Sequence, residues 1–477
     1  MANASFQFLG FALAVVLAYH LHRSSAWRQV VLLAANLLFL ASFLEGRWSY
    51  APLAAFVILA YAGVLWIRAF PKSVGPLVVA ITIAAFVWLK KYAFVPGSLF
   101  LAFPYVTVGL SYILFRVLHL MIDTSAGDLP DRIPAVSYFN YTLSFTTLVS
   151  GPIQLYQDYV KMQEAASAKR LDAPSALRSI ERIVVGMFKV NILALLFSTW
   201  HACSLEALSL GGPVSGRVLH GAILIVSYPL FLYCNFSGYI DVVIGIAQLL
   251  GFTLPENFSR PFAADNFIEF WSRWHITLSN WLKTYVYNPL LMALMRRFPS
   301  ASLETVWLAV ALFVTFFLVG VWHGQTSEFV FFGFLQGFGV AVNRVYQIAM
   351  TKRMGRKRFK SLSASGIYVA LARGLTFTYF TLTTLWFWSN WAQIGSIRAS
   401  LGVAEPAVWL AIFAGSALAL TIWEAIRTRA LAVHMDGIPV VDSPYWRTAQ
   451  STALAVVVLV VTLLMNQSAP DIVYKAF

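Results

Sequence analysis

Residues 235–252 read NFSGYIDVVIGIAQLLGF, residues 255–290 read PENFSRPFAADNFIEFWSRWHITLSNWLKTYVYNPL, and residues 318–324 read LVGVWHG. These segments decide the fold, because they combine membrane-depth apolar runs with polar groups that are costly to bury. The first segment carries Asn235, Ser237 and Asp241 in an otherwise apolar run. An ionisable residue at that depth costs roughly 2.5–3.5 kcal/mol on insertion scales, so it is usually paired or functional. From the residues alone, Asp241 is expected to bond to a neighbouring helix.

Residues 266–285 are predicted to form one amphipathic helix. Asn266 suits the N-cap, with Glu269 three residues on as its capping-box partner, and Pro261 and Pro289 bracket the segment. The large apolar residues recur at helical spacing and share one face, namely Phe267, Phe270, Trp271, Trp274, Leu278, Trp281, Leu282 and Tyr285. A basic, aromatic-rich helix of this kind often lies in the membrane interface.

Two histidines in these segments are candidates for chemistry. His275 lies at the border of the aromatic stripe, one turn before Ser279, and His323 ends a membrane-depth run between Trp322 and Gly324. A histidine at membrane depth serves as a general base, a proton relay, a metal ligand or a satisfied structural group. The residues alone leave the catalytic and the structural roles open for both.

The composition excludes an ordinary soluble domain. Of 477 residues, 59% are hydrophobic and 11% are charged, and apolar runs of about 18 or more residues recur along the chain. We therefore predict an all-α polytopic membrane protein with roughly 11–13 membrane-embedded helices. The net charge of +14 is typical of Lys- and Arg-rich cytoplasmic loops and does not favour nucleic-acid binding. The two cysteines, Cys203 and Cys234, predict neither a disulfide framework nor a metal site.

The apolar runs predict the order of the spans. They lie near residues 6–22, 28–45, 50–70, 75–90, 99–122, 183–200, 218–250, 304–323, 328–350, 368–390, 405–426 and 447–466. The first run is interpreted as a span, not as a cleaved signal. Residues 137–151 are apolar but short, which suits a re-entrant or buried half-helix. The run 218–250 is long for one crossing, so a break is expected around Asn235–Gly238.

Charged residues refine this order. Arg116 and His119 fall inside a span, so they are expected to face the bundle interior or a cavity, because a lipid-facing charge is costly. The run after residue 350 is the clearest cytoplasmic marker, formed by Lys352, Arg353, Arg356, Lys357, Arg358 and Lys360.

Elimination narrows the chemistry that His323 would perform. No metal spacing accompanies either histidine, and no GxSxG elbow or Walker loop is present. General base catalysis on a hydroxyl remains, since an alcohol is a poor nucleophile until a positioned base takes its proton. Such a base suits acyl transfer from a thioester, and a buried channel would keep water from hydrolysing the donor.

Several motifs in order resemble the membrane-bound O-acyltransferase (MBOAT) family. They are NFSGYIDVVIGIAQLLGF, PENFSRPF, FWSRWHITLSNWLKTYVYNPL and GVWHG, preceded by VGLSYILFRVLHLMID and LVSGPIQLYQDY. The chain is most similar to the bacterial branch that includes the alginate O-acetylation protein and the D-alanyl transferase of teichoic acid modification. The resemblance covers residues 105–345 well, and the flanking spans 1–104 and 346–477 by hydropathy. It implies one MBOAT-type membrane domain over residues 1–477.

The resemblance implies a ring of helices around a central tunnel in a bacterial cytoplasmic (inner) membrane. It implies a cytoplasmic thioester donor, on coenzyme A or a carrier protein, with no bound cofactor. The acyl group, expected to be acetyl, would pass to a hydroxyl of an extracytoplasmic polysaccharide with the help of a periplasmic or extracellular partner protein. It places the family's invariant histidine at His323, as base, and its second histidine at His275. The predicted substrate-binding residues are Asn235, Ser237, Asp241, Trp274, Ser279 and Trp322.

One departure concerns the acceptor. Alginate-type members usually carry a Gly-Gly-Asn-Arg loop after YxYxPL, whereas this chain reads NPLLMALMRRF, closer to the D-alanyl transferase pattern. Two other classes stay open. A transporter or flippase for a lipid-linked or polar solute would show internal repeats and matching broken helices, and none is evident. A non-catalytic scaffold of an acylation complex would tolerate loss of His323.

Overall fold

The computed structural model describes residues 5–44, 46, 48–168, 171–435, 438–464 and 470. Seven of the described helical segments are long and apolar enough to cross a membrane, and three shorter apolar helices lie in the N-terminal part. The strands within the described residues are the two-residue pair β1 (His434–Met435) and β2 (Ile438–Pro439). The predicted all-α polytopic class is therefore confirmed, whereas the number of embedded helices and the tunnel stay predictions.

The chain divides into two compact units. Among the described residues, the first unit comprises those in 5–190 and 235–255, and the second comprises those in 191–234 and 256–464. The helix α10 (Val214–Leu249) contributes its first part to the second unit and residues 235–249 to the first. The single integrated membrane domain stays a prediction.

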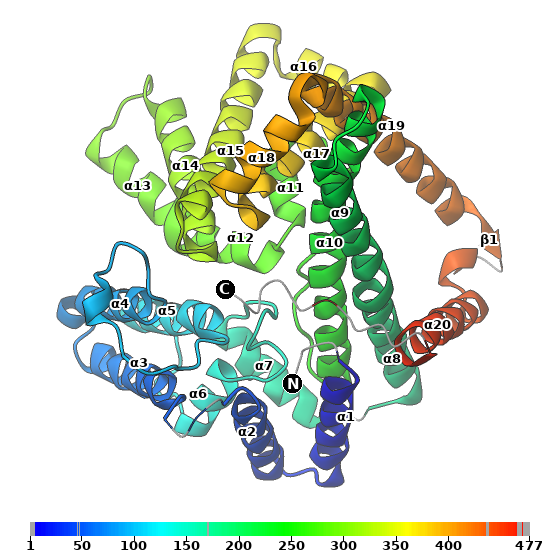
Figure 1. The fold of residues 1–477 in the computed structure, drawn as a ribbon. Coiled ribbons are helices and arrows are strands. Elements are labelled where there is room, and N and C mark those ends of the chain that lie inside the picture. Colours follow the sequence, from blue (N-terminus) through cyan, green and yellow to red (C-terminus); the bar gives the residue numbers. More distant parts are fainter. Residues whose placement is uncertain are drawn as a thin grey trace. The chain divides into compact units, whose positions relative to one another are not determined.

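The first unit is built on α5, which is buried from Leu110 to Met121. The helices α3 and α4 lie beside it (Figure 1). Besides the last part of α10, the elements of this unit are α1 (Phe6–Leu21), α2 (Ser25–Ala41), α3 (Ala51–Ala69), α4 (Pro71–Leu89), η1 (Gly97–Leu99), α5 (Leu110–Ala126), α6 (Ala135–Thr142), α7 (Tyr156–Ala168), α8 (Ala173–Phe188) and the start of the π-helical η2 (Lys189–Ala194). Residues 143–155, after the half-helix α6, are mostly buried and largely non-helical, as expected for 137–151.

Two predictions about spans in this unit are wrong. The span expected at 99–122 begins at Leu110, because Gly109 adopts a left-handed conformation (φ +75°) that ends the preceding extended segment. The helix α10 is continuous through Asn235–Gly238, where a break was expected. Gly238 serves close packing instead: a Cβ added at Gly186 of α8 would lie 2.5 Å from the Gly238 carbonyl oxygen. Small residues that let helix backbones approach are typical of membrane interfaces.

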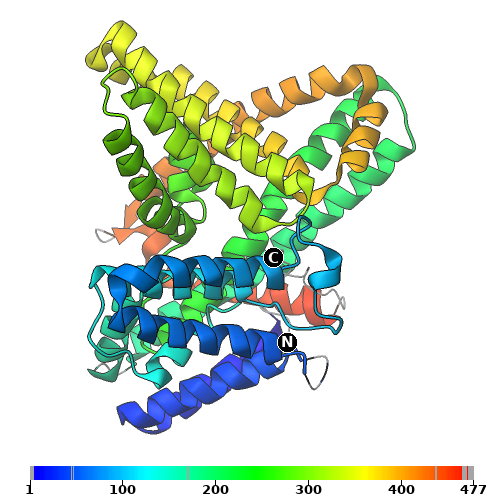
Figure 2. The same ribbon diagram turned by 90° about the vertical axis from the view of Figure 1, so that its left-hand side faces the viewer.

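The second unit contains two long helical pairs. The hairpin α14–α15 appears in yellow-green in Figure 2, and α17 packs on α19. Besides the first part of α10, its elements are α9 (Leu195–Ser209), η3 (Pro261–Ala263), α11 (Phe267–Arg273), α12 (Ile276–Leu282), the π-helical η4 (Lys283–Tyr287), α13 (Asn288–Arg297), α14 (Glu304–His323), α15 (Ser327–Met354), α16 (Arg356–Ser363), α17 (Gly366–Trp388), α18 (Trp391–Leu401), η5 (Gly402–Ala404), α19 (Glu405–Ala432), η6 (Val440–Asp442), α20 (Pro444–Leu459) and η7 (Val460–Leu464). The expected span 447–466 extends into residues outside the described ones.

The single helix predicted for 266–285 is also wrong, because α11 and α12 are separated at Trp274 and His275. The N-cap prediction is confirmed in half: the Asn266 side chain accepts a hydrogen bond from the Glu269 backbone N–H at 2.9 Å. The Glu269 carboxylate accepts from the Asp265 N–H, not from that of Asn266. Pro289 does not end the helical segment, since it occupies the first turn of α13, where proline is tolerated.

Candidate functional site

His323 is the last residue of α14 and is 3% exposed. Its imidazole packs among aromatic rings of the second unit. The ring centroid is 4.6 Å from that of Trp322, 5.1 Å from that of Phe387 on α17, and 6.1 Å from that of Phe332 on α15. Gly324 follows in an extended conformation, and a Cβ there would meet the Phe329 ring at 2.0 Å. A side chain at residue 324 would therefore displace the Phe329 ring.

His275 is positioned by a break in the helical segment. Its backbone is left-handed (φ +47°), and its side chain is 1% exposed. The fully buried Asn257 supports the break: its carbonyl accepts from the Ile276 N–H at 3.0 Å, and its Oδ1 accepts from the Thr277 N–H and hydroxyl at 3.1 and 2.9 Å. A non-glycine residue in this conformation costs of order 1–3 kcal/mol and persists where the surroundings impose it, often at a functional site.

The indole ring of Trp322 lies beside the imidazole rings of both histidines. The Trp322 ring, adjacent to His323, lies 6.3 Å from the His275 ring. The fold thus brings together three residues predicted from sequence, His275, Trp322 and His323.

Trp274 and Ser279 lie near these three residues but in different surroundings. Trp274 packs in a neighbouring aromatic cluster, 5.1 Å from the rings of both Phe258 and Phe380. Ser279 is half-buried at the start of α12, where its N–H donates to the His275 carbonyl at 3.0 Å. Substrate contacts by Trp274, Ser279 and Trp322 stay a prediction.

Gln336 is a polar residue beside the site that the sequence interpretation missed. It is fully buried on α15, where it accepts from Trp271 Nε1 at 3.2 Å and donates to Thr383 Oγ1 at 2.8 Å. These bonds connect α11, α15 and α17, the last two of which contribute rings that pack on His323. A glutamine in the most apolar part of the run 328–350 was the available signal, since buried amides require partners.

The remaining predicted residues, Asn235, Ser237 and Asp241, lie in the first unit. Asn235 and Ser237 are buried. Asp241 confirms the expectation of an inter-helix bond: its Oδ1 pairs with Arg182 of α8 at 3.0 Å, and its Oδ2 pairs with Lys189 at 2.6 Å. A tunnel-wall or substrate-binding role for these three residues stays a prediction.

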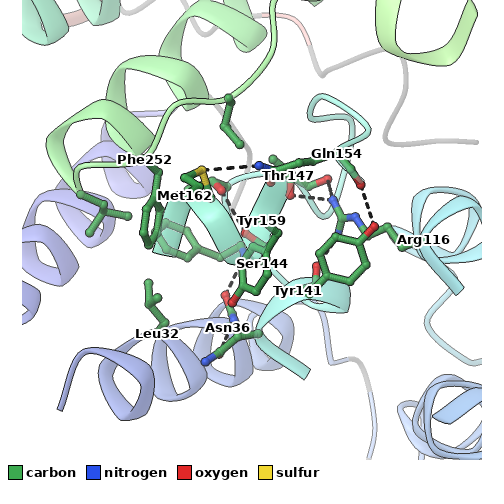
Figure 3. A pocket seen from close by; sticks show the side chains of 15 residues that line it. Leu32, Asn36, Arg116, Tyr141, Ser144, Thr147, Gln154, Tyr159, Met162 and Phe252 are labelled. Carbon is green, nitrogen blue, oxygen red and sulfur yellow. Dashed lines mark hydrogen bonds between the residues drawn. The ribbon is translucent and has the colours of Figure 1, made fainter. Parts of the chain in front are cut away.

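Arg116 faces the interior of the first unit, as predicted, and is 2% exposed. Its two terminal nitrogens donate to the carbonyls of Tyr141, Thr142 and Thr147 and to the Thr147 hydroxyl, at 2.6–3.2 Å. Figure 3 shows Arg116 beside Tyr141 and Thr147. A cavity of about 20 Å³, lined by both polar and apolar side chains, lies beside the guanidinium and is large enough for roughly one water molecule. Arg116 thus satisfies the carbonyls around residues 143–147, and irregular backbone at membrane depth needs such partners.

His119, one turn after Arg116, is buried as predicted and contacts two partners. Its Nε2 accepts from the Tyr156 N–H at 2.9 Å, which places the ring proton on Nδ1, 3.2 Å from Asp123. The pair holds the start of α7 against α5.

The buried His275 makes a testable contribution to stability. Burial lowers the pKa of His275 from 6.5 to about 3, so it is neutral at pH 7. Below pH 6.5 the unfolded chain binds a proton at His275 and the folded chain does not. The free energy of unfolding is therefore not lowered by His275 above pH 6.5. As the pH falls below 6.5, His275 should lower the free energy of unfolding by about 1.4 kcal/mol per pH unit. Thermal unfolding of His275→Gln in detergent should show a shallower decline between pH 6.5 and 5 than the wild type.

Subtracting the two pH profiles isolates this effect. Burial and the neighbouring Asp265 raise the pKa of Glu269, which stabilises the folded state on acidification and opposes the histidine in both proteins. Parallel wild-type and His275→Gln profiles would contradict a neutral buried His275.

These observations define a class: a polytopic all-α membrane protein in which buried histidines of one helical unit meet around a tryptophan. The chain belongs to the membrane-bound O-acyltransferase (MBOAT) family, whose model matches residues 22–382. The family predicted from the sequence motifs is therefore confirmed.

Curated relatives come from two groups. The chain is 28% identical over 233 residues to the teichoic acid D-alanyltransferase of Bacillus subtilis, covering 47% of this chain and 56% of that protein. It is 29% identical over 248 residues to a probable alginate O-acetylase of Pseudomonas aeruginosa, covering 52% and 44%. A teichoic acid D-alanyltransferase of Streptococcus thermophilus is 26% identical over 295 residues, covering 59% and 70%. The chain spans about half the length of the first two relatives.

Proposed function

We propose that this chain is a membrane O-acyltransferase that moves an acyl group from a cytoplasmic thioester to a hydroxyl of an extracytoplasmic polysaccharide. The observation that carries the proposal is the buried imidazole of His323 at the end of α14. Membership of the MBOAT family and the names of the relatives, an O-acetylase and D-alanyltransferases, support it. The location that follows is a bacterial cytoplasmic membrane.

The proposed reaction begins with an acceptor hydroxyl bound at His323. The imidazole takes the hydroxyl proton as the oxygen attacks the thioester carbonyl carbon. The tetrahedral intermediate then expels the sulfur, and the imidazolium returns the proton to the leaving thiolate. The C-terminal end of α14 carries partial negative charge, which favours the imidazolium that forms between these steps. The surrounding rings of Trp322, Phe332 and Phe387 limit the access of water, a competing acceptor.

His275 has a different proposed role. Neutral at pH 7, it suits a hydrogen bond to a substrate oxygen without a charge of its own. Its position across the Trp322 ring supports a positioning role, not a second base. Asn235, Ser237 and Asp241 are proposed to shape the wall of the acyl path, with Trp274 and Ser279 near the acceptor.

The test is the acyl content of surface polysaccharides in a host that lacks the gene, complemented with the wild-type chain or an empty vector. Restored O-acylation is expected, and the polymer that changes identifies the acceptor. Inverted membrane vesicles supplied with acyl-coenzyme A or with an acylated carrier protein then identify the donor. An unchanged polymer with altered export of a lipid-linked solute would favour a transporter and contradict acyl transfer.

A further inference from the structure

The second unit carries an open groove along α15 and α17. Its volume is about 790 Å³, and it is capped at one end by α16. Its apolar walls are largely exposed side chains, namely Phe338, Val342, Leu371 and Leu375. The floor is closed where Gly339 meets Tyr379: a Cβ at Gly339 would lie 2.4 Å from the tyrosine ring. The Tyr379 ring therefore packs directly on the Gly339 backbone to form the floor, and the exposed walls are free to contact a long apolar chain.

The end of the groove nearest α16 is polar. Tyr346 and Tyr368 place their hydroxyls 3.2 Å apart, and Asp265 and Gln347 also line the groove. The Oδ1 of Asn343 is buried and accepts no hydrogen bond from the described residues. A buried acceptor without a donor is costly, so the groove suits a ligand that brings a hydroxyl to this position.

Exposed cations surround the same end. Gly355 turns the chain in a left-handed conformation (φ +80°), so that Phe359 of α16 packs on Tyr346 at 6.1 Å. Six exposed basic residues flank this turn, and none forms an ion pair within the described part of the chain: Lys352, Arg353, Arg356, Lys357, Arg358 and Lys360. Arg353 is seven residues after Tyr346, so it falls on the groove face of α15.

We propose that this groove binds an anionic phospholipid with a hydroxyl-bearing headgroup, of the phosphatidylglycerol class. An acyl chain lies along Phe338, Val342 and Leu375, and the phosphate meets Arg353 and Arg356. A headgroup hydroxyl donates to Asn343 Oδ1 once the amide turns toward the groove, because this atom is buried in this structure. Basic pockets beside membrane helices are recognised sites for anionic headgroups. The proposal is independent of the acyl-transfer function, because it concerns a resident lipid, not the reaction.

A second groove of the chain serves as the matched control. The groove between α3 and α4 in the first unit has a volume of about 770 Å³, and none of the described residues that line it is charged. If any exposed groove retained lipid equally well, the two would behave alike. The basic turn and the buried amide acceptor distinguish the α15–α17 groove.

The test counts phospholipids retained by the full-length purified chain in native mass spectrometry after extensive detergent washing. Phosphatidylglycerol, phosphatidylserine and phosphatidylcholine are then added back separately. The wild type should hold one phosphatidylglycerol in preference to phosphatidylserine, and phosphatidylserine in preference to phosphatidylcholine. Since each basic residue near a membrane surface contributes about 1 kcal/mol, Arg353→Gln with Arg356→Gln should weaken binding of phosphatidylglycerol about tenfold or more.

Four variants decide the outcome. Leu375→Trp fills the groove and should also lose the lipid, whereas Leu59→Trp fills the α3–α4 groove and should not; the two leucines are 62% and 70% exposed. Arg296→Gln with Arg297→Gln removes two exposed arginines from α13 and should retain the lipid. The proposal would be overturned if all variants retained the lipid equally well, or if the control variants lost it as much as the test variants did. Binding of phosphatidylcholine as strong as that of phosphatidylglycerol would also overturn it. If Leu375→Trp fails to fold, the arginine pair still decides, because both arginines are exposed.

Discussion

Replacement of His323 by glutamine is expected to lower acyl transfer by roughly 10²–10⁴-fold, the usual contribution of a general base. Glutamine keeps a similar size and a hydrogen-bonding end but takes no proton at neutral pH. Because the proton transfer occurs in the transition state, kcat should fall while KM changes little. The measurement is single-turnover acyl transfer in proteoliposomes, with wild-type and variant chains at matched membrane abundance.

His201→Gln is the matched control for this prediction. His201 lies in the same unit, in ring contact with Trp388 at 4.4 Å, and has no assigned role in the reaction. It should retain activity near that of the wild type. If His323→Gln transfers acyl groups at the wild-type rate, His323 is structural and its role as the general base is contradicted. If both variants lose activity equally, the loss reflects folding, not base catalysis.

Hydropathy was sufficient to predict most of the helices. In lipid, an apolar segment must form a helix so that its backbone N–H and C=O groups hydrogen-bond to each other. Hydropathy also predicted that Arg116 and His119 turn inward, since a buried cation needs local partners. The partners themselves could not be predicted: the carbonyls that Arg116 contacts lie 25–31 residues away along the chain. Their position depends on a loop geometry that has no periodic signal.

The same limit explains the wrong prediction for residues 266–285. The aromatic stripe continues through His275 at helical spacing, so periodicity alone favours one helix. The break depends on Asn257, twenty residues before Thr277, which it bonds. A contact of that range is absent from any local window. The strained conformation that positions His275 is therefore a tertiary feature, although the histidine itself was identified from sequence.

Glycines show a related ambiguity. A break was expected around Asn235–Gly238 because the run 218–250 is long for one crossing, yet Gly238 lies in a continuous α10 against Gly186. The sequence shows that a glycine is present, but only the partner helix reveals whether it bends the chain or permits close approach. The packing of α14 on α15 near His323 depends on close approach, because Gly320 lies against Gly333.

Replacement of Gly320 by alanine is expected to destabilise the protein by about 1–3 kcal/mol, the range for an overpacked contact. A Cβ at this position would lie 2.3 Å from the backbone of Gly333 and 2.6 Å from the Phe329 carbonyl oxygen. These are backbone atoms, so α14 and α15 must separate to make room. Thermal unfolding in detergent should show a lower melting temperature, although alanine favours a helix more than glycine does.

Gly415→Ala is the matched control, because Gly415 lies within helix α19 and no atom lies within 4 Å of its added Cβ. There the higher helix propensity acts alone and should raise stability by up to about 1 kcal/mol. Gly320 is one turn before His323, so separating α14 from α15 should also pull the imidazole away from Phe332 and lower acyl transfer. Equal melting temperatures for Gly320→Ala and Gly415→Ala would mean that the two helices do not pack through Gly320 and Gly333. The packing around His323 would then require another explanation.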